Sequence, residues 1–188
     1  MKKGWATTGK SFWYVYTGIG TIGIAEDGKG ISDLFFVSAL ALFEESVQMM
    51  PDSIPASFTS LEETNIESIG VIKETPLLRK AADQLEEYFS GSRKTFDLPL
   101  SYQGTPFQMA DWNALLTIPY GETRSYKQIA QQIGRPGAYR AVGMANNRNP
   151  ISIIIPCHRV IGHDGSMVGY GGGLAYKEYL LQLEQKHR

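Results

Sequence analysis

Cysteine is nearly absent from this chain, and histidine is confined to its C-terminal end. Cys157 is the single cysteine among 188 residues, so no disulfide can form within the chain. The histidines are His158, His163 and His187. Residues 1–156 therefore offer neither of the side chains that usually hold structural zinc, and the paired Cys-x-x-Cys and His-Glu-x-x-His spacings are missing. We expect no exported disulfide scaffold and no bound metal.

A long apolar segment is also missing from the N-terminus. Met1-Lys2-Lys3 is followed by the small and polar stretch 4–10, which resembles neither a secretory signal nor a membrane span. A hydrophobic content of 43% is nevertheless enough to bury a core, which argues against a mainly disordered chain. We therefore expect a folded, cytoplasmic protein without membrane contact.

Net charge is close to zero, at −1, but it is unevenly distributed. Residues 1–100 carry 14 acidic and 9 basic side chains, whereas 101–188 carry 5 acidic and 9 basic ones. No Asp or Glu interrupts the bases between Thr123 and His163, which are Arg124, Lys127, Arg135, Arg140, Arg148 and Arg159. This basic window is a candidate DNA-binding face. The alternative is a solvated surface with a chance run of one sign.

Short strands and one helix are predicted in the first hundred residues. The strands are Ser11–Tyr16, Thr21–Ala25 and Ile31–Val37, and their turn signals favour an antiparallel sheet. Further predictions are a helix over Ala39–Met50, a surface loop over Pro51–Gly70, and a helix from Pro76 to Gly91 that is capped by Thr75 and packs on the sheet. We place a domain boundary near residue 100, giving domains 1–100 and 101–188.

Helices dominate the predictions for the second domain. Thr105-Pro106 opens a helix with Phe107, Trp112, Leu115 and Leu116 directed inward, and Gln108 completes a capping box with Thr105. Helices over Ser125–Ile133 and Ala138–Arg148, joined by a glycine-containing turn, form a helix-turn-helix pattern inside the basic window. The first of these two helices begins with a second capping box, Ser125 with Gln128. After these we expect a buried strand over Ile151–Ile155, a hairpin at Asp164-Gly165, and a last helix from Leu174 to about Lys186.

Cys157 is the candidate nucleophile. A thiol reacts as its thiolate, so a base must take the proton, and His158 is the adjacent candidate. Neighbouring side chains of an extended backbone point in opposite directions, so contact requires a bend or a bridging water. Glu184, by its residue type, could orient the imidazole. The alternatives are an inert buried cysteine, or a metal site of Cys157, His158 and His163.

The residues around Cys157 resemble the active-site signature of the O6-alkylguanine-DNA alkyltransferases (methylated-DNA--protein-cysteine methyltransferases). The signature is Ile155-Pro156-Cys157-His158-Arg159-Val160, and the resemblance is strong over residues 80–186. Other matching segments follow in the same order, namely Ile118–Thr123, Ser125-Tyr126, Arg140–Gly143, Asn149-Pro150, Tyr170–Leu174 and Lys177–Glu184.

The resemblance implies an α+β chain with two parts. One is a small N-terminal α/β domain with a ribonuclease-H-like sheet, and the other is a mostly helical, winged-helix-like domain with the helix-turn-helix and the thiol. It also implies repair of double-stranded DNA by a monomer without a cofactor. An alkyl group passes from O6-alkylguanine to Cys157 once per molecule, and O4-alkylthymine is left open as a second substrate.

Residue roles follow from the same resemblance. His158 accepts the thiol proton through a water, Glu184 supports the imidazole, and Asn149 braces the turn before the active site. Arg140 enters the base stack as the damaged nucleotide flips out. Small residues of the DNA-reading helix, Ala138 and Gly143 among them, allow close approach to the minor groove.

The pocket for the base is implied to involve Tyr126, Tyr170, the amide of Gly171, and the carbonyls of Cys157 and Val160. Tyr126 would also help protonate the departing base. This sequence departs from the family pattern at Tyr139 and Met144, where smaller side chains are common, and at Gly171, where serine or alanine is frequent.

Two rival functions remain open at this point. A helix-turn-helix regulator with a structural cysteine explains the basic window but not the Cys157-His158 pair. A cysteine hydrolase explains that pair but not a basic helix immediately upstream of it.

Overall fold

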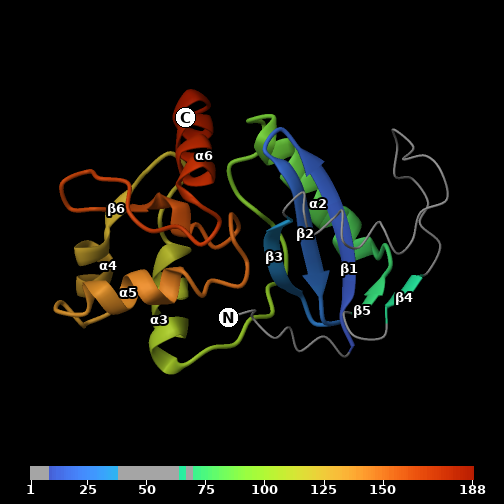
Figure 1. Ribbon diagram of the computed structural model, residues 1–188, viewed down its shortest axis with the longest axis horizontal. Helices are drawn as coiled ribbons and strands as arrows, with labels where there is room; N and C mark the ends of the chain where they lie inside the picture. Colours follow the sequence, from blue (N-terminus) through green and yellow to red (C-terminus); the bar gives the residue numbers. More distant parts are fainter. Residues whose placement is uncertain (1–8, 38–63, 67–69) are drawn as a thin grey trace. The chain divides into compact units, whose positions relative to one another are not determined.

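The computed structural model describes residues 9–37, 64–66 and 70–188, and these residues fall into two compact units (Figure 1). The first unit is Met1–Asp83 with Leu98–Ser101, and the second is Gln84–Asp97 with Tyr102–Arg188. The division runs through a helix, so that residues 84–97 group with the C-terminal part of the chain. Among the described residues, no helix is both long and apolar enough to cross a bilayer.

The first unit is built on a five-stranded sheet of order β3-β2-β1-β5-β4. Its strands are β1 (Ser11–Thr17), β2 (Gly20–Glu26), β3 (Ile31–Val37), β4 (Thr64–Ile66) and β5 (Gly70–Ile72). The first three form the predicted antiparallel meander, and β5 runs parallel to β1 (Figure 1). Ile22, Ile24 and Leu34 are buried, so one side of the meander is a hydrophobic core.

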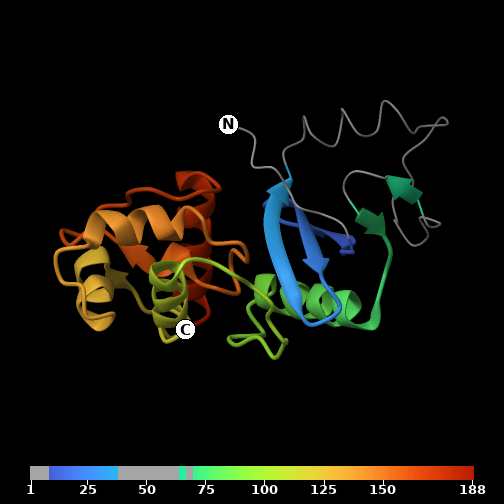
Figure 2. The ribbon, with the colours of Figure 1, turned by 90° about the horizontal axis from the view of Figure 1, so that it is seen from below.

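The predicted helix after Thr75 is confirmed as α2 (Pro76–Phe89). Thr75 Oγ1 accepts a hydrogen bond from the amide of Leu78 (3.1 Å), and Pro76 needs no partner for its nitrogen at the first helical position. The first half of α2 runs along one face of the sheet in both views (Figures 1 and 2). Gly91, with φ of +80°, follows its end.

Two N-terminal predictions concern segments of which little is described. The helix predicted over Ala39–Met50 lies outside the described residues, as does most of the predicted loop Pro51–Gly70. That loop was wrong in part, because it contains β4 and the first residue of β5. β5 pairs with β1 and β4 pairs with β5, so sheet pairing recruits these short segments, which carry no strong alternating pattern of their own.

The second unit is mostly helical, as predicted. Its regular elements are α3 (Pro106–Leu115), β6 (Arg124–Ser125), α4 (Tyr126–Gln132), α5 (Tyr139–Asn146), the 3-10 turn η1 (Cys157–Arg159), β7 (Val160–Ile161) and α6 (Leu174–Lys186). Thr105 with Gln108 and Ser125 with Gln128 form both predicted capping boxes. α4 and α5 pack together and are joined by a turn at Gly134, which confirms the helix-turn-helix (Figure 2).

The strand predicted over Ile151–Ile155 is wrong, because this segment is a buried turn. Ile155 donates its amide hydrogen to the carbonyl of Ile151 (2.9 Å), and Ile153 has a positive φ of 71°. The Asn149 side chain occupies the Ile151 amide and the Ile155 carbonyl, the groups that a neighbouring strand would need. The apolar run correctly indicated burial but not the backbone conformation.

Two smaller predictions also need correction. Leu116 is 41% exposed because α3 ends at Leu115, whereas Trp112 and Leu115 are buried and Phe107 is half-buried. A turn forms at Asp164-Gly165, but β7 pairs in parallel with β6 rather than with a strand beyond that turn. A chain reversal therefore does not by itself specify which strands pair.

A buried acidic side chain, Asp111, lies on α3 among the core residues. It is fully buried, and burial raises its pKa to about 7. Asn146 of α5 donates to Asp111 Oδ2 (2.7 Å) once its amide is oriented to satisfy both groups, and Oδ1 has no hydrogen-bond partner among the described residues. Asp111 is therefore protonated in the folded protein at mildly acidic pH.

We predict that Asp111→Asn reduces the loss of stability between about pH 4 and pH 7. A carboxyl whose pKa is higher in the folded than in the unfolded state stabilises the fold at low pH and loses that contribution as pH rises toward the folded pKa. The free energy of unfolding is measured with urea at pH 5 and at pH 7.5. Between these two pH values, that of the variant should rise relative to that of wild type by roughly 1–4 kcal/mol, at about 1.4 kcal/mol per pKa unit. Glu178→Gln, which removes an exposed carboxyl from the same unit, should keep the wild-type pH dependence; if both variants match wild type, the buried carboxyl does not titrate as stated.

Candidate functional site

Cys157 begins η1 and is held almost out of contact with solvent. Its side chain is 4% exposed, and burial raises the pKa of the thiol to about 11. A hydrogen bond from Asn149 and the positive charge of Lys177 act in the opposite direction. The resting thiol is therefore protonated at neutral pH and needs a base. The 3-10 turn supplies the bend that an extended Cys157-His158 pair would lack.

Asn149 connects the sulfur to the turn that precedes it. Its Nδ2 lies 2.7 Å from the Ile155 carbonyl and 3.1 Å from Cys157 Sγ, and its Oδ1 accepts from the amide of Ile151 at 3.0 Å. One side chain thereby fixes both ends of the buried turn and directs a donor at the sulfur. A donor in this position favours the thiolate over the thiol.

His158 is fully buried and bonded to a carboxylate. Its Nε2 lies 2.8 Å from Glu184 Oε1. Because Glu184 is ionised, Nε2 carries the proton, and Nδ1 keeps its lone pair. Nδ1 is buried and has no hydrogen-bond partner among the described residues. Burial lowers the pKa of His158 despite the opposing effect of Glu184, so the ring is a neutral base at physiological pH.

Glu184 of α6 is the most heavily bonded side chain of the site. Arg159 donates through Nε and Nη2 at 2.9 to 3.2 Å, and the amide of Gly121 donates to Oε2 at 3.0 Å. Tyr88 of α2 donates its hydroxyl hydrogen to Oε1 at 2.7 Å. Burial alone would raise the pKa of Glu184, but the bonds and charges of His158 and Arg159 outweigh it and hold the pKa well below its usual range.

Arg159 does not belong to the surface that the sequence assigned to it. It was counted in the basic window, yet it is buried, and its Nη1 donates to the carbonyl of Ile118 at 2.6 Å. The prediction failed because the sequence of bases does not reveal that a carboxylate 25 positions later neutralises one of them. Arg124 also pairs with Glu122, at 3.0 Å, so the exposed positive charge of the window is smaller than its count of bases.

Lys177 is a site residue to which the sequence assigned no role. It is fully buried, and burial lowers its pKa to about 8. Its Nζ donates to the carbonyls of Val160 (2.6 Å) and Val168 (2.9 Å), and it lies 5.7 Å from the centre of the Tyr126 ring. A signal was available, because Lys177 and Glu184 are seven positions apart and so share one helix face.

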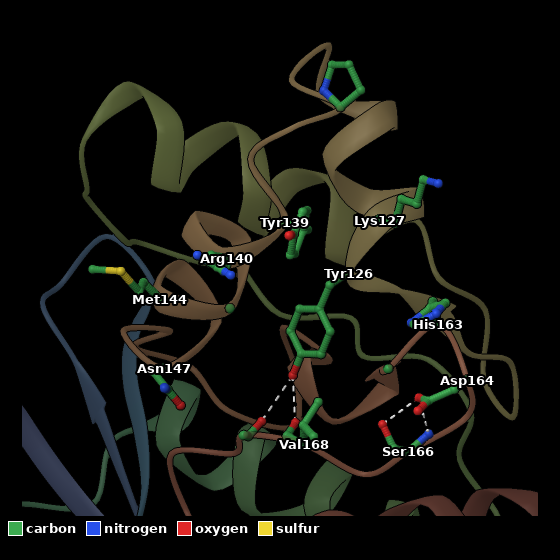
Figure 3. Close-up of a pocket in the computed structure, with 14 residues that line it drawn as sticks. Tyr126, Lys127, Tyr139, Arg140, Met144, Asn147, His163, Asp164, Ser166 and Val168 are labelled. Atoms are coloured by element: carbon green, nitrogen blue, oxygen red, sulfur yellow. Dashed lines mark hydrogen bonds between the residues drawn. The ribbon is translucent and has the colours of Figure 1, made fainter.

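A cavity of about 710 Å³ opens between α4, α5 and the loop after β7 (Figure 3). Tyr126, Arg140 and Gly143, three of the predicted DNA-binding residues, line it. Tyr139 and Met144 line it as well and are 47% and 60% exposed. These two bulky residues therefore face the open side of α5 and do not fold away from it.

The remaining predicted residues lie outside the lining of this cavity. Ala138 is the half-buried N-cap residue of α5, and Tyr170 is half-buried. Val160 is fully buried with its carbonyl bonded to Lys177, and Gly171 is exposed. Cys157 is not part of the lining either, so Tyr126 is the one residue predicted for the base pocket that the described lining of this cavity includes.

Tyr126 is the predicted residue that relates the cavity to the thiol. It lines the cavity while its hydroxyl lies 2.8 Å from the Val168 carbonyl and 3.2 Å from that of Gly169 (Figure 3). Burial raises its pKa to about 12, with a contribution from the charge of Cys157. Within the part of the chain that the structure describes, no three His, Cys, Asp or Glu side chains cluster as metal ligands.

Comparison with known proteins gives consistent matches over both units. Residues 13–102 match the family model of the 6-O-methylguanine DNA methyltransferase ribonuclease-like domain, and residues 106–186 match that of its DNA binding domain. A methylated-DNA--protein-cysteine methyltransferase of Methanosarcina barkeri is 49% identical over 90% of this chain and 93% of its own length. One of Mycobacterium tuberculosis is 62% identical over 56% of this chain and 64% of its own.

A solved structure resembles the fold of the whole chain. The crystal structure of Mycobacterium tuberculosis OGT in complex with DNA superposes with a TM-score of 0.74 at 41% identity, covering 94% of each chain. The α+β fold class, with a sheet-containing N-terminal part and a helical C-terminal part, is thereby confirmed. By its sequence over nearly its full length, the chain belongs to the family of methylated-DNA--protein-cysteine methyltransferases.

Proposed function

We propose that this chain repairs double-stranded DNA by moving an alkyl group from the O6 oxygen of guanine to the sulfur of Cys157. The observation that carries the proposal is a pair of hydrogen bonds beside a buried thiol, one from Asn149 to Cys157 and one between His158 and Glu184, in a chain of this family. Relatives that carry the methyltransferase name, and a relative solved with DNA, support the reaction and the partner.

The bond changes follow from the groups present. The thiol proton passes to His158 Nδ1 through a bridging water, and Glu184 stabilises the resulting imidazolium. The thiolate attacks the alkyl carbon, so a carbon–sulfur bond forms while the bond from carbon to O6 breaks. The guanine leaves as its anion and takes up a proton, for which Tyr126 is the proposed donor. The proton held by the His158 imidazolium replaces the one that Tyr126 gives up, so in net terms the thiol hydrogen ends on guanine. The product is a thioether, which is stable, so each molecule acts once.

Delivery of the base requires that the nucleotide leave the DNA stack. The alkylated oxygen lies inside a paired duplex, and flipping costs a few kcal/mol, less for a poorly paired base. Arg140 lines the cavity on α5 and is proposed to enter the vacated position. Because Cys157 is only 4% exposed, the base must displace atoms that now cover the sulfur. Tyr170 and the amide of Gly171 are the proposed contacts of the bound base.

Two further assignments belong to the same proposal. Every proposed catalytic group comes from one chain, which supports action as a monomer. An unpaired nucleophilic thiol is best kept in a reducing compartment, which supports a cytoplasmic location. A helix-turn-helix regulator with a structural cysteine is less favoured, because it gives no reason to bury His158 and Glu184 beside the thiol.

The first test is the mass of the protein after incubation with duplex DNA carrying O6-methylguanine. We expect a gain of one methyl group in place of one hydrogen, located on Cys157, with no further gain when fresh DNA is added. Cys157→Ala and undamaged duplex are the controls and should give no gain. Continued turnover of substrate, or an unchanged mass of the wild-type protein, contradicts the proposal.

A second test separates the chemistry from the delivery of the base. Glu184→Gln should slow methyl transfer roughly 100-fold or more with both duplex DNA and the free O6-methylguanine base, because the imidazole loses its ionic partner. Arg140→Ala should slow transfer from duplex DNA roughly 10- to 100-fold and leave the free base unaffected, because only extrusion needs the arginine. Single-turnover rates measure both effects, and equal losses of Arg140→Ala on the two substrates would refute the proposed role of Arg140.

A further inference from the structure

Tyr88 contributes a contact to the proposed catalytic group from outside the DNA-binding domain. It lies on the last turn of α2, 18 residues before the matched DNA binding domain begins at 106, and 96 positions from Glu184 in sequence. Its hydroxyl donates to Glu184 Oε1 at 2.7 Å, and both side chains are fully buried. The sequence predicted a helix over this segment, packed on the sheet, and assigned Tyr88 no role in the site.

The surroundings of Tyr88 fix its ring. It packs against Phe89, Phe96 and Tyr120 with centroid separations of 5.4 to 6.0 Å. A Cβ atom added at Gly91 would lie 2.3 Å from the His187 ring, so the chain just after α2 runs directly against the end of α6. Burial and the charge of Glu184 raise the pKa of Tyr88, so its hydroxyl keeps its hydrogen and can only donate it to the carboxylate.

We propose that Tyr88 is a positioning residue, which orients the Glu184 carboxylate and, through it, sets the basicity of His158. Oε1 of Glu184 is the atom that faces His158, and Tyr88 donates to that same atom. The other donors to this carboxylate do not act on Oε1 alone. Arg159 donates to both oxygens, and the amide of Gly121 donates to Oε2. The role in alkyl transfer rests on the proposed function, whereas the coupling between Tyr88 and His158 does not.

The expected effect of losing the hydroxyl has a definite sign. A donated hydrogen bond withdraws charge from Oε1, so its removal makes that oxygen a stronger acceptor toward the His158 proton. Three charged groups act on His158, namely Glu184, Arg159 and Lys177. A Tyr88→Phe substitution leaves all three in place. The pKa of His158 should therefore rise in Tyr88→Phe, and the neutral, proton-accepting ring should appear only at higher pH.

The experiment uses the full chain and compares Tyr88→Phe with Tyr120→Phe. Tyr120 packs edge-on against Tyr88 at 6.0 Å, and its hydroxyl has no hydrogen-bond partner among the described residues. Tyr120→Phe therefore makes the same chemical change beside the same ion pair and keeps the ring next to Arg159, but removes no hydrogen bond from Glu184. Two quantities are measured for each protein. One is the His158 titration, from NMR of histidine labelled with nitrogen-15, and the other is the single-turnover rate of methyl transfer against pH.

We expect the His158 titration, and with it the acidic limb of the rate profile, to move to higher pH in Tyr88→Phe only, with transfer at least about 10-fold slower at neutral pH through misorientation of the carboxylate. An acidic limb that stays in place or moves to lower pH, or a change shared with Tyr120→Phe, would overturn the positioning role. If Tyr88→Phe shifts the His158 titration but the wild-type protein itself transfers no methyl group, the proposed function is refuted instead, and with it the role of Tyr88 in transfer.

Discussion

The site depends on one buried negative charge, the carboxylate of Glu184. A charge without water is costly unless it is paired and hydrogen-bonded, and here Arg159, His158, Tyr88 and a backbone amide supply the donors. These donors come from three separate segments of the chain, so the carboxylate can remain ionised only when those segments are packed together around it. The packing that stabilises the Glu184 charge is therefore also the packing that assembles the catalytic group. Removing one partner would leave the others bonded to an unbalanced charge, which is why such groups are sensitive to single substitutions.

The same low-dielectric surroundings act in opposite directions on the two reacting groups. Burial raises the pKa of Cys157 to about 11 and lowers that of His158, so the thiol and the neutral imidazole coexist at physiological pH. A protein that is consumed by reacting once avoids premature inactivation if its thiol stays protonated until a target base arrives. The reason is that the thiolate is the form that reacts with oxidants and other electrophiles. Asn149 and the buried Lys177 limit this elevation of the thiol pKa, so the thiol remains ionisable once a base is available.

The sequence predicted those features that depend on local residue patterns. Both capping boxes, the three-stranded meander and the helix-turn-helix follow from neighbouring residues, and the structure contains them. The family resemblance rested on the segment around Cys157. The failures share a cause, because each concerns a side-chain partner that lies outside the segment whose pattern was read. Asn149 converts the apolar run Ile151–Ile155 from a strand into a turn, Glu184 withdraws Arg159 from the surface, and Tyr88 joins α2 to α6. No periodicity within a segment reports such partners.

The division of the chain into compact units gives this last failure a consequence. A match to a DNA binding domain over 106–186 suggests a self-contained module, yet residues 84–97 group with it and deliver Tyr88 to its buried carboxylate. The helix that carries Tyr88 begins in the unit that holds the sheet. The buried carboxylate therefore depends on a donor that lies before the matched domain. A fragment that began at residue 106 would keep Glu184 but lack the Tyr88 hydroxyl, so the boundary of the matched domain is not the boundary of the catalytic group.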